Sequence, residues 1–127
     1  MSAGHKERDL AARPLPFLVI WGLPIGVLVL VNFLEGVLAT TLLVLIVAAA
    51  FAWMGIACVI NARRCRRLHC YVSGPVFLVG AAAIALFGLR VVDLGPDSAT
   101  IASAVTGTLA LASFALEWVW GRYLQRP

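Results

Sequence analysis

The chain has 127 residues, of which 62% are hydrophobic, and it carries a net charge of +4. This apolar content lies far above the roughly 45–50% of soluble domains and excludes an ordinary water-soluble fold. Nucleic-acid binding is not expected either, because the basic residues are confined to short segments bordering apolar runs. The three cysteines lie in or near one predicted cytosolic edge, where thiols stay reduced, so a disulfide framework is not expected. Their odd number would also leave one cysteine unpaired.

Four long apolar runs predict an all-α integral membrane bundle of four transmembrane helices. Runs of about 20 apolar residues can cross the hydrocarbon core as helices, and continuous runs favour helices over the alternating strands of a barrel. The predicted spans cover about 15–34, 37–60, 70–89 and 99–119. Residues 1–14 are predicted to form a cytosolic tail and residues 15–127 the membrane domain. The first run is too long for a signal peptide and should remain uncleaved.

The first span contains Gly22 and Gly26 at a spacing that permits close helix approach. Pro24 should kink the same helix. Glu35 follows the span and is expected in a tight turn at the outer interface. In the fourth run, small residues recur at helical spacing and predict a packing face: Ala99, Ser103, Gly107 and Ala110.

Basic residues predict the orientation of the bundle. Three lie in the tail, four in the segment 61–69 and two at the C-terminus, against one in the loop after the third span. Lys and Arg concentrate on the cytoplasmic side of membrane proteins. Both termini and the arginine-rich segment are therefore predicted to be cytosolic.

The candidate chemistry lies in Asn61–Tyr71, which reads NARRCRRLHCY. Cys65 and His69 are four residues apart, so on a helix they could chelate one ion. If the second helix continues through them, Cys58 lies on the same face, about 10 Å along the axis, as a relay ligand. Thiolates and imidazole suit thiophilic metals such as Zn or Cu(I). The predicted metal ligands are Cys65, His69, Cys70 and Cys58.

Cys70 would approach Cys65 and His69 if the chain turns between Arg66 and Leu68. The alternative interpretation is structural, with Cys58 acting as a small buried hydrophobe. In that interpretation the arginines bind anionic lipid headgroups at about 1 kcal/mol each. The predicted headgroup ligands are Arg63, Arg64, Arg66 and Arg67.

Enzyme motifs are absent from the sequence, which has no GxSxG, P-loop, HExxH or dinucleotide glycine pattern. Cys65 and His69 could act as nucleophile and base only with an orienting carboxylate. Glu117 would have to be brought to them by packing. No enzymatic activity is therefore predicted.

The string RCRRLHCYVSGPVFLVGA, residues 64–81, resembles the signature of uncharacterised small bacterial membrane proteins with an RCxRxHCYxxGP core. This resemblance implies a location in the bacterial inner membrane. In size and cysteine use the chain is loosely similar to small mercuric-ion transport proteins, but it lacks their vicinal cysteine pair in the first span.

Two functional hypotheses follow from the sequence. In the first, the protein handles or transports a thiophilic metal ion, with Glu35, Asp93 and Asp97 gathering cations outside. In the second, it is a non-catalytic accessory or scaffold subunit of a membrane complex. The expected partners are the lipid bilayer and either a second copy or a larger membrane protein.

Overall fold

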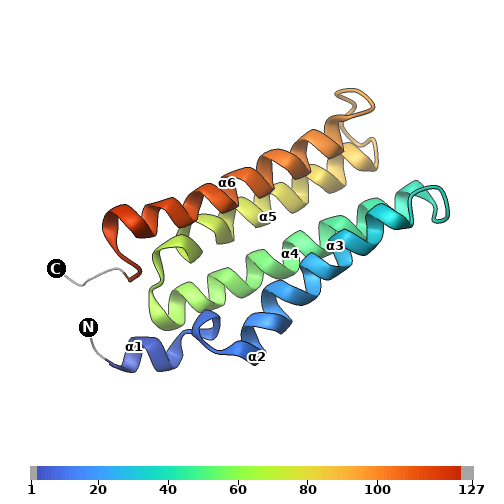
Figure 1. Cartoon of the computed structure of the whole chain (residues 1–127). Helices are drawn as coiled ribbons and strands as arrows, with labels where there is room; N and C mark the ends of the chain where they lie inside the picture. Colours follow the sequence, from blue (N-terminus) through green and yellow to red (C-terminus); the bar gives the residue numbers. More distant parts are fainter. Residues whose placement is uncertain (1–2, 124–127) are drawn as a thin grey trace.

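The computed structural model describes residues 3–123, and the secondary structure of this part is helical without a named strand (Figure 1). The ends of the predicted tail and membrane domain, residues 1–2 and 124–127, lie outside the described residues. In chain order the elements are α1 (Ala3–Arg8), η1 (Leu10–Ala12), α2 (Pro14–Phe17), η2 (Leu18–Gly22), α3 (Leu23–Phe33), α4 (Thr40–Cys65), α5 (Leu68–Gly88) and α6 (Ser98–Trp120).

Four helices are long and apolar enough to cross a membrane, which confirms the predicted all-α architecture and the number of spans. They are Pro14–Phe33, Thr40–Cys65, Leu68–Gly88 and Ser98–Trp120, the first being the continuous stack of α2, η2 and α3. The second differs most from its predicted bounds. It begins at Thr40 and continues through Asn61 to Cys65, where Arg66 adopts a left-handed conformation and ends it.

The four spans form two helical hairpins (Figure 1). The first joins α3 to α4 through residues 34–39, and the second joins α5 to α6 through residues 89–97. Only Arg66 and Arg67 separate α4 from α5. Both hairpin loops lie at one end of the bundle, and the α4–α5 connection lies at the other end with α1 and the last turn of α6.

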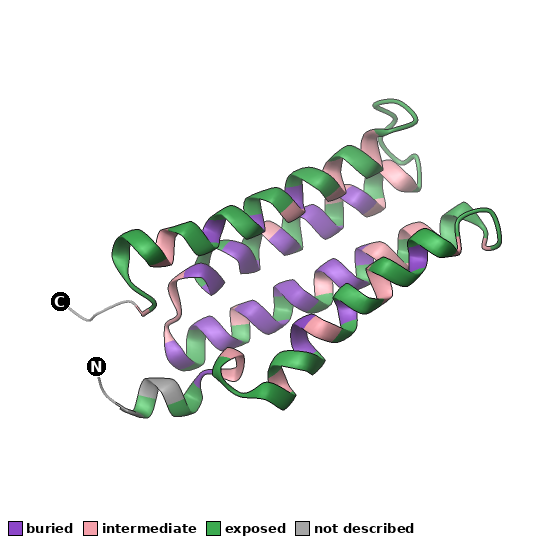
Figure 2. Ribbon diagram, in the orientation of Figure 1, coloured by how far each residue is buried: buried purple, intermediate pink, exposed green. Residues whose placement is uncertain are grey.

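The core lies along the α4–α5 pair, where most of the buried residues are found (Figure 2). Glycine makes the close approaches possible. A Cβ at Gly74 would lie 2.9 Å from the Val59 side chain on α4, and one at Gly80 would lie 2.3 Å from Thr106 on α6. Small residues therefore let the neighbouring helices pack tightly. The outward faces of α3 and α6 are exposed and apolar, as contact with lipid requires.

The first span contains a π-helical turn at Leu18–Gly22, immediately before Pro24. Proline has no N–H, and its ring clashes with the carbonyl four residues earlier in a regular helix. Widening the turn relieves this conflict, and the Leu23 N–H donates to the Leu18 carbonyl five residues back. The turn carries Trp21, which is buried and stacks on Phe17 with ring centroids 5.4 Å apart.

Candidate functional site

Polar side chains from distant parts of the chain meet at the end of the bundle that holds the α4–α5 connection. We call them the polar cluster; its members are Asp9, Asn61, Arg67, His69, Glu117 and Tyr123. They come from the segment before the first span, the end of α4, the α4–α5 connection, the first turn of α5, the last turn of α6 and the segment after it. The cluster therefore joins both hairpins and both terminal segments.

Asp9 is at the centre of the polar cluster, and its side chain is completely buried. Its carboxylate accepts hydrogen bonds from Asn61 Nδ2 at 3.0 Å, Arg67 Nη1 at 2.8 Å and Tyr123 Oη at 2.9 Å. Burial opposes ionisation, but the Asn61 hydrogen bond and the Arg67 charge outweigh it and hold the pKa of Asp9 below its ordinary value. Asp9 is therefore a buried carboxylate that stays charged at neutral pH.

Arg67 connects Asp9 to Glu117. Its Nε donates to Glu117 Oε1 at 3.1 Å, while Nη1 is used by Asp9. Burial disfavours the guanidinium charge, yet the Glu117 hydrogen bond and the Asp9 charge more than compensate and raise the pKa of Arg67. The burial of Tyr123 and its hydrogen bond to Asp9 raise the pKa of that phenol to about 12.

His69 extends the polar cluster toward the cysteines. Its Nδ1 lies 2.5 Å from Glu117 Oε1, and its Nε2 lies 3.4 Å from the Cys70 sulfur. The imidazole also stacks on Phe114 of α6, with ring centroids 4.2 Å apart. Packing thus brings Glu117 to His69, as any role for His69 as a base would require, but the thiol within reach is Cys70.

The three cysteines are all buried and unbridged. Cys65 donates to the Asn61 carbonyl of its own helix at 3.1 Å. Cys58 accepts a hydrogen bond from the Ser73 hydroxyl at 3.6 Å, and its thiol lies within hydrogen-bonding reach of Cys70. The contact between Cys58 and Cys70 therefore joins α4 and α5.

Cys58, Cys65 and His69 do not lie on one continuous helix, because α4 ends at Cys65 and His69 belongs to α5. The chain turns between α4 and α5, which is the other arrangement that the sequence allowed. The turn at Arg66 and Arg67 instead brings Cys70 beside His69. Within residues 3–123, no group of three His, Cys, Asp or Glu side chains is placed to hold a metal ion. The four-ligand metal site stays a prediction without geometric support.

The four arginines of the α4–α5 region have different surroundings. Arg63 and Arg64 are exposed on the last turn of α4, and Arg66 is partly exposed. These three side chains are accessible, and their contact with lipid headgroups stays a prediction. Arg67 differs, because its guanidinium is bound by Asp9 and Glu117 inside the protein.

A cavity of about 420 Å³ lies beside the polar cluster, between the first and fourth spans; we call it the inner cavity. Its walls include five aromatic side chains, those of Phe17, Trp21, Phe51, Phe77 and Phe114. Gly107 and Leu111 contribute part of the α6 wall. Arg67, His69 and Ser73 supply the polar groups of the lining. The inner cavity is thus an apolar chamber beside a hydrogen-bonded cluster.

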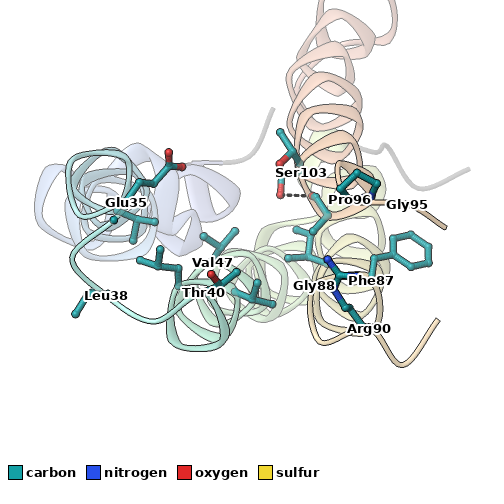
Figure 3. A pocket seen from close by; sticks show the side chains of 17 residues that line it. Glu35, Leu38, Thr40, Val47, Phe87, Gly88, Arg90, Gly95, Pro96 and Ser103 are labelled. Carbon is teal, nitrogen blue, oxygen red and sulfur yellow. Dashed lines mark hydrogen bonds between the residues drawn. The ribbon is translucent and has the colours of Figure 1, made fainter. Parts of the chain in front are cut away.

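A second cavity, of about 460 Å³, lies at the opposite end of the bundle, between the two hairpin loops (Figure 3). Glu35 contributes from the first hairpin and Arg90 from the second. Glu35 is exposed in the turn after α3, as predicted. This outer cavity contains no buried polar cluster comparable to the one beside the inner cavity.

The sequence interpretation missed Asp9, Asn61 and Tyr123 as members of the site. Asp9 gives a weak signal, because it is an acid beside an apolar span in a chain whose arginines are concentrated in one segment. Asn61 gives another, because a polar amide follows a long apolar run. Neither signal identifies its partner, which lies 52 residues away in the Asp9–Asn61 pair.

No protein-family model, curated protein or solved structure matches this chain. The resemblance of residues 64–81 to small bacterial membrane proteins therefore stays a prediction. The helices themselves define the class, a multi-pass membrane protein of all-α architecture with four candidate spans.

Proposed function

We propose that the protein is a non-catalytic accessory protein of the bacterial inner membrane that holds an apolar small molecule in the inner cavity. The observation that carries this proposal is the apolar chamber of about 420 Å³ between the first and fourth spans. Ligand sites usually have volumes of about 300–1,000 Å³, apolar walls and a few fixed polar groups. The inner cavity has all three properties.

Both termini are placed in the cytosol in this proposal. The termini and the α4–α5 connection lie at one end of the bundle (Figure 1). Exposed Arg63 and Arg64 lie at that end, whereas Arg90 lies at the other. The positive-inside rule then favours the cytosol for the end with more basic residues.

The polar cluster supports a binding role over a catalytic one. Among the described residues, no buried side-chain nitrogen or oxygen lacks a hydrogen-bond partner. Arg67 forms ion pairs with both Asp9 and Glu117. The cysteine sulfurs are completely buried, whereas a nucleophile has to reach its substrate. The cluster is better suited to fixing the helices around the cavity.

The proposal is tested by identifying what the purified protein carries. The protein is purified in mild detergent, extracted with organic solvent and analysed by mass spectrometry. A Cβ at Gly107 meets no atom within 4 Å, so Gly107→Leu adds a side chain in open space at the cavity wall. Gly26→Leu is the matched control, because Gly26 has the same open surroundings but does not line the cavity.

We expect a low-mass apolar molecule in the extract of the wild type and of Gly26→Leu, and at least a tenfold depletion in Gly107→Leu. Equal amounts of every extracted compound in the three proteins would contradict the proposal. Size-exclusion profiles check that the three proteins are folded alike.

A second candidate function is the handling of a thiophilic ion by Cys58 and Cys70. The observation favouring it is the proximity of these two thiols across α4 and α5. Soft thiolate ligands select ions such as Cu(I). Titration with Cu(I) under reducing conditions should then give one tight site that is lost in Cys58→Ser and in Cys70→Ser. Cys65→Ser is the control, because Cys65 is equally buried but bonds to its own helix. Equal binding in all variants would exclude this function.

A further inference from the structure

We propose that the inner cavity binds a neutral amphiphile whose polar end is a planar ring bearing a carbonyl oxygen, a compound of the quinone type. This inference rests on the proposed function, because it names the class of molecule that the cavity holds. Four properties of the cavity narrow the class of molecule that it can bind. They are its charge, its available hydrogen-bond donors, its aromatic lining and its size.

The charges of the polar cluster argue against an anionic ligand. Of these charged side chains, Arg67 lines the cavity, and its positive charge is already paired with the carboxylates of Asp9 and Glu117, which do not line it. The sum of these three charges and that of His69 is zero if the imidazole is protonated and minus one if it is neutral. A carboxylate or phosphate entering the cavity would therefore meet no excess positive charge. A neutral ligand avoids the large cost of burying an unpaired ion.

Arg67 provides the donor for a carbonyl oxygen. A guanidinium carries five N–H donors on three nitrogens. The bonds to Glu117 and Asp9 use Nε and Nη1, which leaves Nη2 as a further donor. Arg67 is also one of the residues that line the cavity. A ligand with an acceptor oxygen at one end therefore complements this end of the chamber.

Aromatic side chains from both hairpins favour a flat ring. Phe17 and Trp21 form a stacked pair on the first span, where the π-helical turn lies. Phe114 lines the cavity from the fourth span and stacks on His69. Aromatic groups associate favourably in offset-stacked or edge-to-face arrangements at 4.5–7 Å. Turns of π-helix are also found frequently at functional sites.

Size excludes a partner helix as the occupant. A 20-residue helix is about 30 Å long and about 10 Å across, which corresponds to roughly 2,400 Å³. The inner cavity has about 420 Å³. The opening between the spans faces the region of lipid, because Ile25 and Leu111 line the cavity and are also exposed. An apolar small molecule can therefore enter from the bilayer.

Trp21 is a built-in reporter for this ligand. The reporter protein carries Trp53→Phe, Trp118→Phe and Trp120→Phe, which leaves Trp21 as its single tryptophan. It is reconstituted in nanodiscs of neutral lipid and titrated with decylubiquinone, a short-tailed neutral quinone that quenches indole fluorescence. We expect saturable quenching, weakened at least tenfold by Gly107→Leu and unchanged by Gly26→Leu. Ile25→Phe fills the cavity from the first span and gives a second test if Gly107→Leu does not fold.

Competitors separate the ligand class from the cavity itself. Decane has the tail without the ring, and decanoate at pH 8 has the tail with an anionic head. Displacement of the quinone by decanoate or decane at equal or lower concentration would overturn the neutral ring class, while the proposed function would stand. Quenching that does not saturate, or that is the same in wild type, Gly107→Leu and Ile25→Phe, would overturn the ligand class. If the compounds extracted from the wild type and from Gly107→Leu are also the same, the proposed function is refuted together with the ligand class.

Discussion

Arg67 donates a hydrogen bond to Asp9 at 2.8 Å across a separation of 58 residues. This ion pair joins the segment before the first span to the connection between the two hairpins. The same guanidinium reaches Glu117 at the end of the fourth span. Arg67 therefore connects the segment before the first span to the end of the fourth span, and removal of the pair has a predictable effect.

Asp9→Ala should strongly destabilise the protein. Arg67 keeps its ion pair with Glu117 in this variant, but Asn61 Nδ2 and Arg67 Nη1 lose the carboxylate that accepts their hydrogen bonds. A buried donor left without its acceptor costs about 1–3 kcal/mol. The free energy of unfolding can be followed by denaturation in mixed micelles with circular dichroism. Glu7→Ala is the control, because Glu7 is an exposed acid two residues away. If the two variants have the same stability, Asp9 does not have the structural role assigned to it.

Lowering the pH should reduce the stability of the folded protein, because the Asp9 carboxylate becomes protonated. Its pKa in the folded state is lower than the ordinary 3.8. A depressed carboxyl pKa contributes stability above the unfolded pKa, and this contribution is lost as the pH falls through the folded pKa. The stability of the wild type should therefore fall below about pH 4. The corresponding fall should be smaller in Asp9→Asn. If the stability of the wild type and of Asp9→Asn falls in parallel as the pH is lowered, the loss is not due to Asp9.

Tyr123 should titrate late at alkaline pH. Its folded pKa is raised to about 12 from the ordinary 10.0. A raised pKa contributes stability below the unfolded value, and this contribution is lost as the pH rises through the folded one. Tyr71→Phe leaves Tyr123 as the single tyrosine. Its phenolate absorbance at about 295 nm should then show a midpoint near 12 in the folded protein, and a midpoint near 10 would be a failure of the prediction.

Gly80→Leu should disrupt the packing of α5 against α6. A Cβ at this position would lie 2.3 Å from Thr106, and the longer side chain adds to the overlap. Overpacking of this kind typically costs about 1–3 kcal/mol. Gly26→Leu has open surroundings and should leave the stability nearly unchanged. Thermal unfolding of the two variants distinguishes a packing effect from a general effect of replacing glycine.

Arg66→Gly should make the protein slightly more stable. Arg66 ends α4 with φ 59°, in the left-handed region that glycine adopts without strain. The strain relieved is about 1–2 kcal/mol, partly offset by the greater freedom of glycine in the unfolded chain. Arg64→Gly, inside α4, should instead cost about 1 kcal/mol. Chemical denaturation of both variants would reveal the opposite signs, and a loss of stability in Arg66→Gly would refute the argument.

The helices could be predicted from the sequence because the bilayer imposes a length and an apolar composition on each span. The end of α4 could not be decided from the sequence, because neither glycine nor proline stands at Arg66 to mark it. A helix continuing to His69 and a turn between Arg66 and Leu68 were both possible, and the structure has the turn. The π-helical turn before Pro24 was anticipated only as a kink.

The candidate site was predicted in part. The segment containing Cys65, His69 and Cys70 does lie at a buried polar centre. Its partners could not be found from local spacing, because the Asp9–Asn61 and His69–Glu117 contacts connect residues 52 and 48 positions apart. Such contacts depend on how the helices pack. The inner cavity also depends on packing, since its walls come from both hairpins.

The position of Glu117 near the end of the chain has a consequence for biosynthesis. Arg67 and His69 are made about 50 residues before the carboxylate that both of them contact. A nascent chain that has inserted three spans therefore carries these groups at the membrane edge without that partner. The polar cluster can therefore close only after the last helix has been made and packed against the others.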